Sequence, residues 1–212
     1  MSTHAQLTYP SSVFVSNGEV YIADTLNFRI RKVLHNGQIV TICGTGEKGY
    51  NGDDQPATLA QLNQPSCIAV SSRHEVYISD WGNQRIRKIC RDGMITTIAG
   101  TGQKGFNGDG QLATQAQLDC PNGLFITDQD EVLFADFGNH RIRMIESNGM
   151  MKTIAGTGKR GYNGDDILAT EAQLNYPSSV FKYGNELYIS NLETIDQKNI
   201  TKWKDHNHCR NR

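Results

Sequence analysis

The stretch EVYISDWGNQRIRKI (75–89), followed after a short turn by MITTIAGTGQKGFNGDGQLATQAQL (94–118), has counterparts on both sides along the chain. A step of 56 residues separates three aspartates that each precede an Arg-Ile-Arg triplet: Asp24, Asp80 and Asp136. The same step separates three Asn-Gly-Asp sequences, which begin at Asn51, Asn107 and Asn163. A fixed period of this size predicts a repeat architecture.

The composition argues against several functional classes. The net charge of −1, from 21 basic and 22 acidic residues, supplies no basic field to attract nucleic acid. No apolar run approaches the roughly 18 residues of a membrane span, and the first residues lack the features of a signal peptide. We therefore expect no membrane insertion. The five cysteines (Cys43, Cys67, Cys90, Cys120 and Cys209) share no repeat position, which weakly favours a reducing, intracellular compartment.

Each unit contains four predicted strands. In the second unit these are SCIAVS (66–71), EVYISD (75–80), RIRKI (85–89) and MITTIAG (94–100), rich in β-branched residues and separated by turn signals. Elsewhere Asn17-Gly18 and Gly184-Asn185 predict tight hairpins. Four short antiparallel strands per unit are typical of a propeller blade. We predict one all-β propeller domain over residues 1–212, with blades at 5–64, 65–120, 121–176 and 177–212.

A strand that ends in Asp, followed by Asn-x-Arg-Ile-Arg and closed by Ala-Gly-Thr-Gly, resembles the NHL repeat. Asn139-His140-Arg141-Ile142 is the nearest version of the Asn-His-Leu signature, and the earlier units carry Gln84 and Phe28 where it has His140. The resemblance covers residues 5–177 and implies a β-propeller, usually of six blades. It also implies a range of functions: protein-binding platforms, RNA readers, receptor sensor domains and one group of metal-dependent lyases.

The fourth unit departs from the pattern. Asn191 replaces the aspartate, the following turn is longer, and NITKW (199–203) replaces Arg-Ile-Arg-Met-Ile. The tail after it has no alternation that would predict an outer strand. We therefore expect an incomplete last blade and an open ring or a fragment of a six-bladed propeller. Its free edges could allow self-association.

Long loops follow the fourth strands, as in GEKGYNGDDQPA (46–57). We expect them to be ordered, with Asp53, Asp109 and Asp165 capping short helices and with Leu62, Leu118 and Leu174 packing against the next blade. An alternative is a calcium site formed by Asn51, Asp53 and Asp54. The repeats argue against it, because the second loop replaces the paired acids by Asp109-Gly110 and has no closing glutamate.

Six arginines recur at the same phase of the third strands: Arg29, Arg31, Arg85, Arg87, Arg141 and Arg143. As bands on the surface they could hold RNA phosphates. The alternative is that each unit's aspartate pairs with the arginine directly across the hairpin, as Asp24 with Arg29, Asp80 with Arg85 and Asp136 with Arg141. The register of the charges and the absence of a basic excess favour this pairing.

An enzyme is not indicated. No nucleophile elbow, phosphate loop or paired-acid motif is present, and His35, His74 and His140 lie at different repeat positions, so they cannot converge as zinc ligands. We expect no cofactor. We predict a binding or scaffold module that contacts another protein through loops on one face. The candidate contact residues differ between units: Leu26, Arg73, His74, Trp81, Phe137 and Asp128 to Asp130. For Trp81 and Phe137 the alternative is packing against the adjacent blade.

Overall fold

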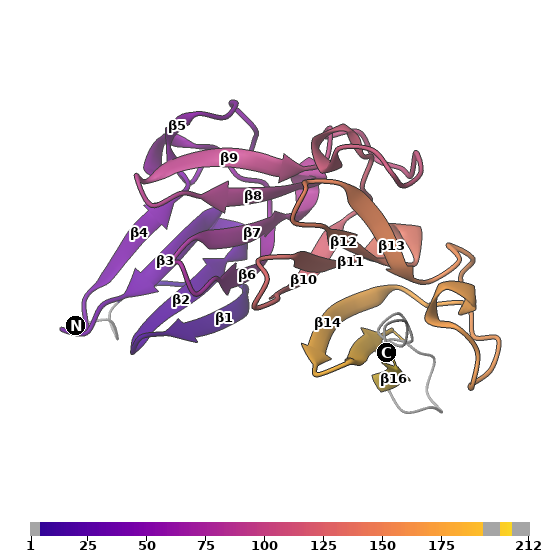
Figure 1. Cartoon of the computed structure of the whole chain (residues 1–212). Coiled ribbons are helices and arrows are strands. Elements are labelled where there is room, and N and C mark those ends of the chain that lie inside the picture. The colour runs from indigo at the N-terminus through magenta and orange to yellow at the C-terminus, as the bar shows by residue number, and fades with distance from the viewer. Residues whose placement is uncertain (1–4, 193–199, 205–212) are drawn as a thin grey trace.

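The computed structural model describes residues 5–192 and the backbone of residues 200–204. Four antiparallel sheets follow one another as an arc, from the indigo N-terminal sheet to the yellow C-terminal one (Figure 1). The first sheet contains β1 (Pro10–Ser16), β2 (Glu19–Asp24), β3 (Arg29–Val33) and β4 (Ile39–Cys43). The second contains β6 (Pro65–Val70), β7 (Val76–Asp80), β8 (Arg85–Ile89) and β9 (Met94–Ala99), extended by the two-residue β5 (Gln55–Pro56).

The other two sheets repeat this order. The third contains β10 (Pro121–Ile126), β11 (Val132–Asp136), β12 (Arg141–Ile145) and β13 (Met151–Ala155). The last contains β14 (Pro177–Tyr183), β15 (Glu186–Asn191) and β16 (Ile200–Lys204), the strand that falls on the predicted NITKW segment. The tail after residue 204, with its cysteine Cys209, lies outside the described residues. The all-β prediction, with four-stranded blades and an incomplete last one, is confirmed in the part of the chain that the structure describes.

Turn chemistry sets the strand ends. At the predicted hairpin between β1 and β2, Asn17 and Gly18 have φ values of 50° and 73°. Two successive left-handed residues make the type I′ turn that suits the twist of paired strands. Between the second and third strands, one-turn 3-10 helices lie at Thr25–Asn27 (η2), Trp81–Asn83 (η4) and Phe137–Asn139 (η6). Each helix ends at a left-handed residue, so the chain reverses within four residues.

The core lies between the sheets. The first strands of neighbouring sheets contact one another, β1 with β6, β6 with β10 and β10 with β14, so they form the inner edge of the arc. Three apolar clusters fill the three spaces between consecutive sheets. Each contains one of the predicted leucines, Leu62, Leu118 or Leu174, all at most 1% exposed. Their predicted packing against the next blade is confirmed, and the loops before them are part of the core.

The predicted aspartate caps of the loop helices are wrong. The loops contain single-turn 3-10 helices at Ala57–Leu59 (η3), Ala113–Gln115 (η5) and Ala169–Glu171 (η7), and none has a side-chain cap. Residues such as Pro56 and Leu112 stand at the N-cap position, three residues after the aspartates. Asp53 and Asp109 instead bind arginines of the following sheet. No described helix is long and apolar enough to cross a membrane.

Candidate functional site

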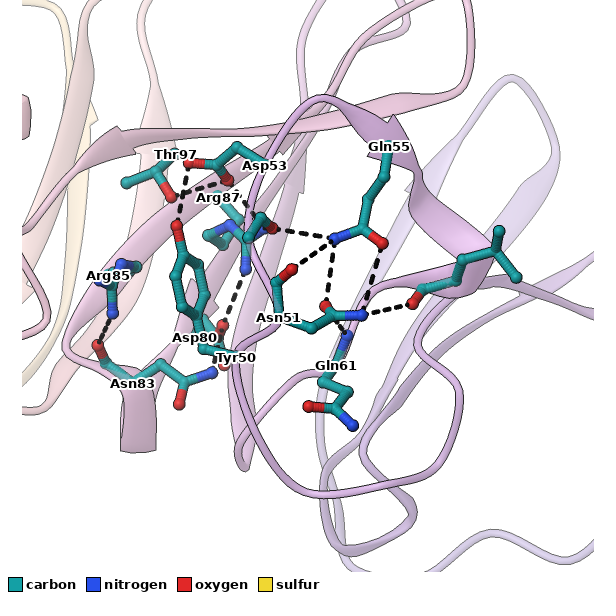
Figure 2. A network of polar contacts seen from close by, with 12 residues as sticks. Tyr50, Asn51, Asp53, Gln55, Gln61, Asp80, Asn83, Arg85, Arg87 and Thr97 are labelled. Carbon is teal, nitrogen blue, oxygen red and sulfur yellow. Dashed lines mark hydrogen bonds and ion pairs between the residues drawn. The ribbon is translucent and has the colours of Figure 1, made fainter.

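The loop between β4 and β6 is held in shape by its own side chains (Figure 2). The Asn51 Nδ2 donates to the Leu59 carbonyl at 3.0 Å, and its Oδ1 accepts from the Gln61 amide at 2.8 Å. The Gln55 Nε2 donates to the Asn51 Oδ1 at 3.1 Å. Asn51 therefore serves as an internal brace that joins the two ends of the turn.

A buried arginine attaches this loop to the following sheet. The Arg87 side chain is fully buried, and its Nη2 donates to the Asp53 carboxylate and to the Gly52 carbonyl, both at 2.9 Å. The Asp53 Oδ1 also accepts from the Thr97 hydroxyl at 3.0 Å. On the other side, the Arg87 Nη1 lies 3.5 Å from Asp80, which is itself fully buried. One guanidinium thus joins two carboxylates, and this geometry fixes the loop to β8 and β9.

Arg85, two positions before Arg87, makes different contacts. The Arg85 guanidinium donates to the carbonyls of Asn83 and Thr101 at 3.0 and 2.8 Å. Its Cζ lies 3.8 Å from the centre of the Tyr50 ring, which is a cation–π contact. Tyr50 also donates its hydroxyl to Asp53 at 3.1 Å. The aromatic residue of the loop is therefore anchored at both its ring and its hydroxyl.

The predicted pairing of each aspartate with the directly opposite arginine is wrong. Asp80 does lie across from Arg85 in the strand register, but its ion pair is with Arg87. The same holds for Asp24 with Arg31 at 3.6 Å, not Arg29, and for Asp136 with Arg143 at 3.2 Å, not Arg141. Residues two apart share a face of a strand. In the second sheet, Arg85 donates to backbone carbonyls, so the Asp80 carboxylate pairs with Arg87.

Burial dominates the electrostatics of the paired aspartates. Loss of hydration raises the pKa of Asp80 to about 6, against the opposing effects of the Asn63 amide, the Asn83 side chain and Arg87. The same burial raises the pKa of Asp136 to about 6. The carboxylates are thus costly to ionise in the fold, and their hydrogen bonds only partly offset that cost.

The third sheet repeats the arrangement. The Arg143 Nη2 donates to the Asp109 carboxylate at 2.9 Å and to the Gly108 carbonyl at 3.0 Å, and Thr153 donates to Asp109 at 3.1 Å. Arg141 lies 3.8 Å from the centre of the Phe106 ring. The motif is therefore a repeated joint between consecutive sheets.

The signature histidine position has a structural role in the same joint. The His140 Nδ1 accepts from the Tyr176 amide at 3.1 Å, and in the preceding unit the Gln84 side-chain oxygen accepts from the Cys120 amide. Burial lowers the pKa of His140, which keeps the ring neutral and able to accept. Glutamine can replace the histidine because an acceptor is all that the backbone amide requires.

Similarity to known proteins identifies the repeat. Residues 35–107 match the family model described as the Teneurin NHL domain. The chain is built of NHL repeats. It is 38% identical to human Teneurin-4 over 104 residues, which cover 42% of this chain and 4% of that protein. It is 32% identical to NHL repeat-containing protein 2 of Gallus gallus over 147 residues, covering 64% of this chain and 20% of that protein. The NHL chain thus spans a small part of the length of these curated relatives.

Solved structures show the same fold at low sequence identity. A protein of unknown function from Bacteroides thetaiotaomicron superposes with a TM-score of 0.65 at 19% identity, over 84% of this chain and 43% of that one. A streptogramin B lyase superposes with a TM-score of 0.55 at 16% identity, over 86% and 48% of the two chains. These likenesses establish the propeller fold of the NHL repeats and nothing about their chemistry.

The predicted contact residues fall at two ends of the blades, not on one face. Leu26, Trp81 and Phe137 lie between second and third strands, at the end that carries the Asn-Gly-Asp loops; we call this the loop end. Arg73 and His74 lie in the turn between β6 and β7, at the opposite end, because antiparallel strands alternate their turns between the two ends. Asp128 to Asp130 occupy the equivalent turn of the third sheet.

A groove at that opposite end lies between the second and third sheets. Its volume is about 580 Å³, and its lining includes Arg73, Lys88, Asp130 and Glu146. Arg73 and Asp130 form an ion pair of 2.7 Å within it. His74 points elsewhere, within 3.4 Å of the Asn17 side chain of the first sheet.

Two of the calcium candidates, Asn51, Asp53 and Asp54, use side-chain oxygens within the fold. The Asn51 Oδ1 accepts from the Gln61 amide, and the Asp53 Oδ1 binds Arg87. Among the residues that the structure describes, no group of three or more His, Cys, Asp or Glu side chains is placed to hold a metal ion. The sequence analysis predicted that Asp53 caps a helix, whereas it pairs with Arg87. A usable signal was present, because the same pair recurs 56 residues later as Asp109 and Arg143.

Proposed function

We propose that this chain is a non-catalytic module that binds another protein through its loop end. The supporting observation is the joint between sheets. The first two loops are each anchored by a fully buried arginine, Arg87 or Arg143, and by an aromatic ring stacked on a second arginine. A loop fixed in this way presents its exposed residues at little further entropic cost on binding.

The residues displayed by this rigid frame differ between repeats. The first position of the 3-10 turn is Thr25, Trp81 or Phe137, and the second is Leu26, Gly82 or Gly138. Their backbones are equivalent, since η2, η4 and η6 share one geometry. A constant frame with variable side chains suits recognition of a partner.

Trp81 is the strongest candidate for a contact residue. Phe137 has a neighbour in the next blade, because its ring centre lies 4.9 Å from that of Tyr176. At the position of Tyr176, the blade that follows Trp81 has the smaller Cys120. Trp81 is half-buried, and large aromatic residues of this kind often anchor protein interfaces.

A photo-crosslinking experiment tests the proposal. Benzoylphenylalanine replaces Trp81 in one variant and Ser147, an exposed residue at the opposite end, in the matched control. We expect defined protein adducts from position 81 and none of the same adducts from position 147. Trp81→Ala should lose the partner at an unchanged melting temperature. Equal adducts from both positions, or a loss of stability with unchanged binding, would contradict a contact role at the loop end.

The RNA alternative has no comparable support. The side chains of Arg87 and Arg143 are 0% exposed and already bound to carboxylates, so no phosphate can reach them. Arg29, Arg85 and Arg141 each donate to two backbone carbonyls.

A further inference from the structure

The groove between the second and third sheets has the size of a ligand site. Its volume of about 580 Å³ falls within the roughly 300–1,000 Å³ that is usual for small-molecule pockets. Apolar side chains from both sheets line it, Ile98 from β9 and Val132 and Ile145 from the third sheet. Leu112, in the loop that joins the two sheets, also lines the groove and is 48% exposed. An apolar molecule can therefore lie against both sheets at once.

Several polar groups of the lining are not used by the fold. The side chains of Thr96, Thr114 and Gln129 make no hydrogen bond within the part of the chain that the structure describes. The Glu146 carboxylate likewise has no hydrogen bond and no ion pair with a described residue. These groups are therefore available to a bound molecule.

Glu146 also leaves the charge of the groove unbalanced. Arg73 of the second sheet and Asp130 of the third neutralise each other at 2.7 Å. The Lys88 ammonium lies 3.0 Å from the Glu75 carboxylate of its own sheet. Among the described charged residues of the lining, Glu146 is thus the one without an oppositely charged partner.

The polar lining does not follow the repeat. At the equivalent place between the first and second sheets, Cys90 stands at the position of Glu146 and Val40 at the position of Thr96. The aspartates and arginines of the joints, by contrast, recur at the 56-residue step. Consecutive sheets therefore pack without a carboxylate or a hydroxyl at these two positions, so the fold does not require them.

The charges of the lining favour a cationic ligand. An anion would meet an unpaired carboxylate and two cations that already have partners. A neutral apolar molecule would remove the Glu146 carboxylate from water without offering it a partner, which is costly. A cation supplies the missing charge, and its hydrogen bond to a carboxylate is stronger than one between neutral groups.

We propose that this groove binds a small organic cation, a protonated amine on an apolar body. The ammonium group pairs with Glu146, and the apolar body lies against Ile98, Val132 and Ile145. The groove is at the end of the blades opposite to the loop end. The proposal therefore does not rest on the function proposed above, and its test is independent of the crosslinking experiment.

The probe is tryptamine, titrated into the full chain labelled with ¹⁵N and followed by the NMR shifts of the backbone amides. Two molecules with the same indole ring serve as comparisons: tryptophol, which has a neutral hydroxyl in place of the ammonium, and the anion indole-3-propionate. We expect saturable shifts with tryptamine at amides of the lining, such as those of Thr96, Asp130 and Gly149. Tryptophol should bind at least about tenfold more weakly, because it lacks the charged hydrogen bond, and the anion should not saturate.

Matched variants assign the effect to one carboxylate. Glu146→Gln keeps the size of the side chain and should weaken tryptamine at least about tenfold. In this variant the difference between tryptamine and tryptophol should disappear. The melting temperature should not change, because Glu146 has no partner among the described residues. Glu171→Gln removes an equal charge from an exposed site on η7, outside the groove, and should leave the affinity unchanged.

Three results would overturn the proposal. The first is the absence of saturable shifts with tryptamine. The second is equal affinity of the native chain for tryptamine and tryptophol, which would mean that the ammonium group makes no specific contact. The third is binding of tryptamine that Glu146→Gln and Glu171→Gln weaken equally or not at all, since this would show only general attraction to an acidic surface.

Discussion

The first and second sheets carry the same joint residues in two states. In the second sheet, Arg87 is fully buried between Asp53 and Asp80, and Ile68 is 2% exposed. In the first, Arg31 forms its ion pair with Asp24 of its own sheet, and Val13 is 64% exposed. The first three units therefore encode the residues of the joint, while the presence of a neighbouring loop decides whether these residues act as core or as surface.

The largest difference is expected at the arginines. Arg87→Ala leaves two carboxylates without their shared cation and should cost about 3–5 kcal/mol of unfolding free energy. Arg31→Ala leaves one buried carboxylate, Asp24, which keeps its hydrogen bonds from Thr8 and Asn27, and should cost less, about 1–3 kcal/mol. Urea denaturation of both variants measures the contrast. Equal losses would mean that the ion pair of Arg87 with Asp53 adds nothing to the free energy of unfolding.

Truncation of the apolar residues should show the same contrast between the two sheets, with smaller losses of unfolding free energy. Ile68→Ala creates a cavity between two sheets and should lower the free energy of unfolding by about 2–5 kcal/mol. Val13→Ala, at the equivalent open position, should change it by less than about 0.5 kcal/mol. A loss of more than about 1 kcal/mol at Val13 would show that this exposed face of the first sheet is already covered in solution.

The filled joints should also respond to pH. Because burial raises the pKa of Asp80 and Asp136 to about 6, the folded state holds protons that the unfolded state releases near pH 4. The contribution of each group to stability is therefore fully present below pH 4 and lost as the pH rises through 6, by an amount on the order of 3 kcal/mol. Unfolding free energies measured from pH 4 to 7 should fall less steeply in Asp80→Asn.

The smallest effect is expected with RNA. Single-stranded RNA titrated by fluorescence anisotropy at low and moderate salt should show no steeply salt-dependent binding, because the buried arginines cannot reach phosphates. If binding did appear, Arg31→Ala and Lys152→Ala would separate a specific contact on the first sheet from nonspecific charge. A selective loss in Arg31→Ala would make this partly exposed arginine a phosphate contact.

The sequence was informative where one unit determines the structure. The 56-residue step, the Asn17-Gly18 turn and the alternating strands depend on local chemistry, and the structure confirms the blades that they predict. The joint was not predicted, because it connects residues 34 apart, such as Asp53 and Arg87, across two units. Phase alone could not decide between Arg85 and Arg87, which share a strand face, and helix-capping preference suggested a local role for Asp53.

The candidate contact residues could also be predicted only in part from the sequence. Sequence variation between units selected Trp81 and Arg73 equally, since both differ from their counterparts. Strand direction, which the pattern already implied, places them at opposite ends of the blades. Only the packing of Phe137 on Tyr176 separates a residue that supports the neighbouring blade from one that is available to a partner.

Each of these loops binds the sheet that follows it in the chain, and this order matters for folding during synthesis. Asp53 precedes Arg87 in the chain, and Asp109 precedes Arg143, so a loop leaves the ribosome before the blade that receives it. Each new blade can close at once on a partner that has already emerged, as expected for a protein that folds by adding units to a growing end. The order of translation and the order of assembly therefore run in the same direction.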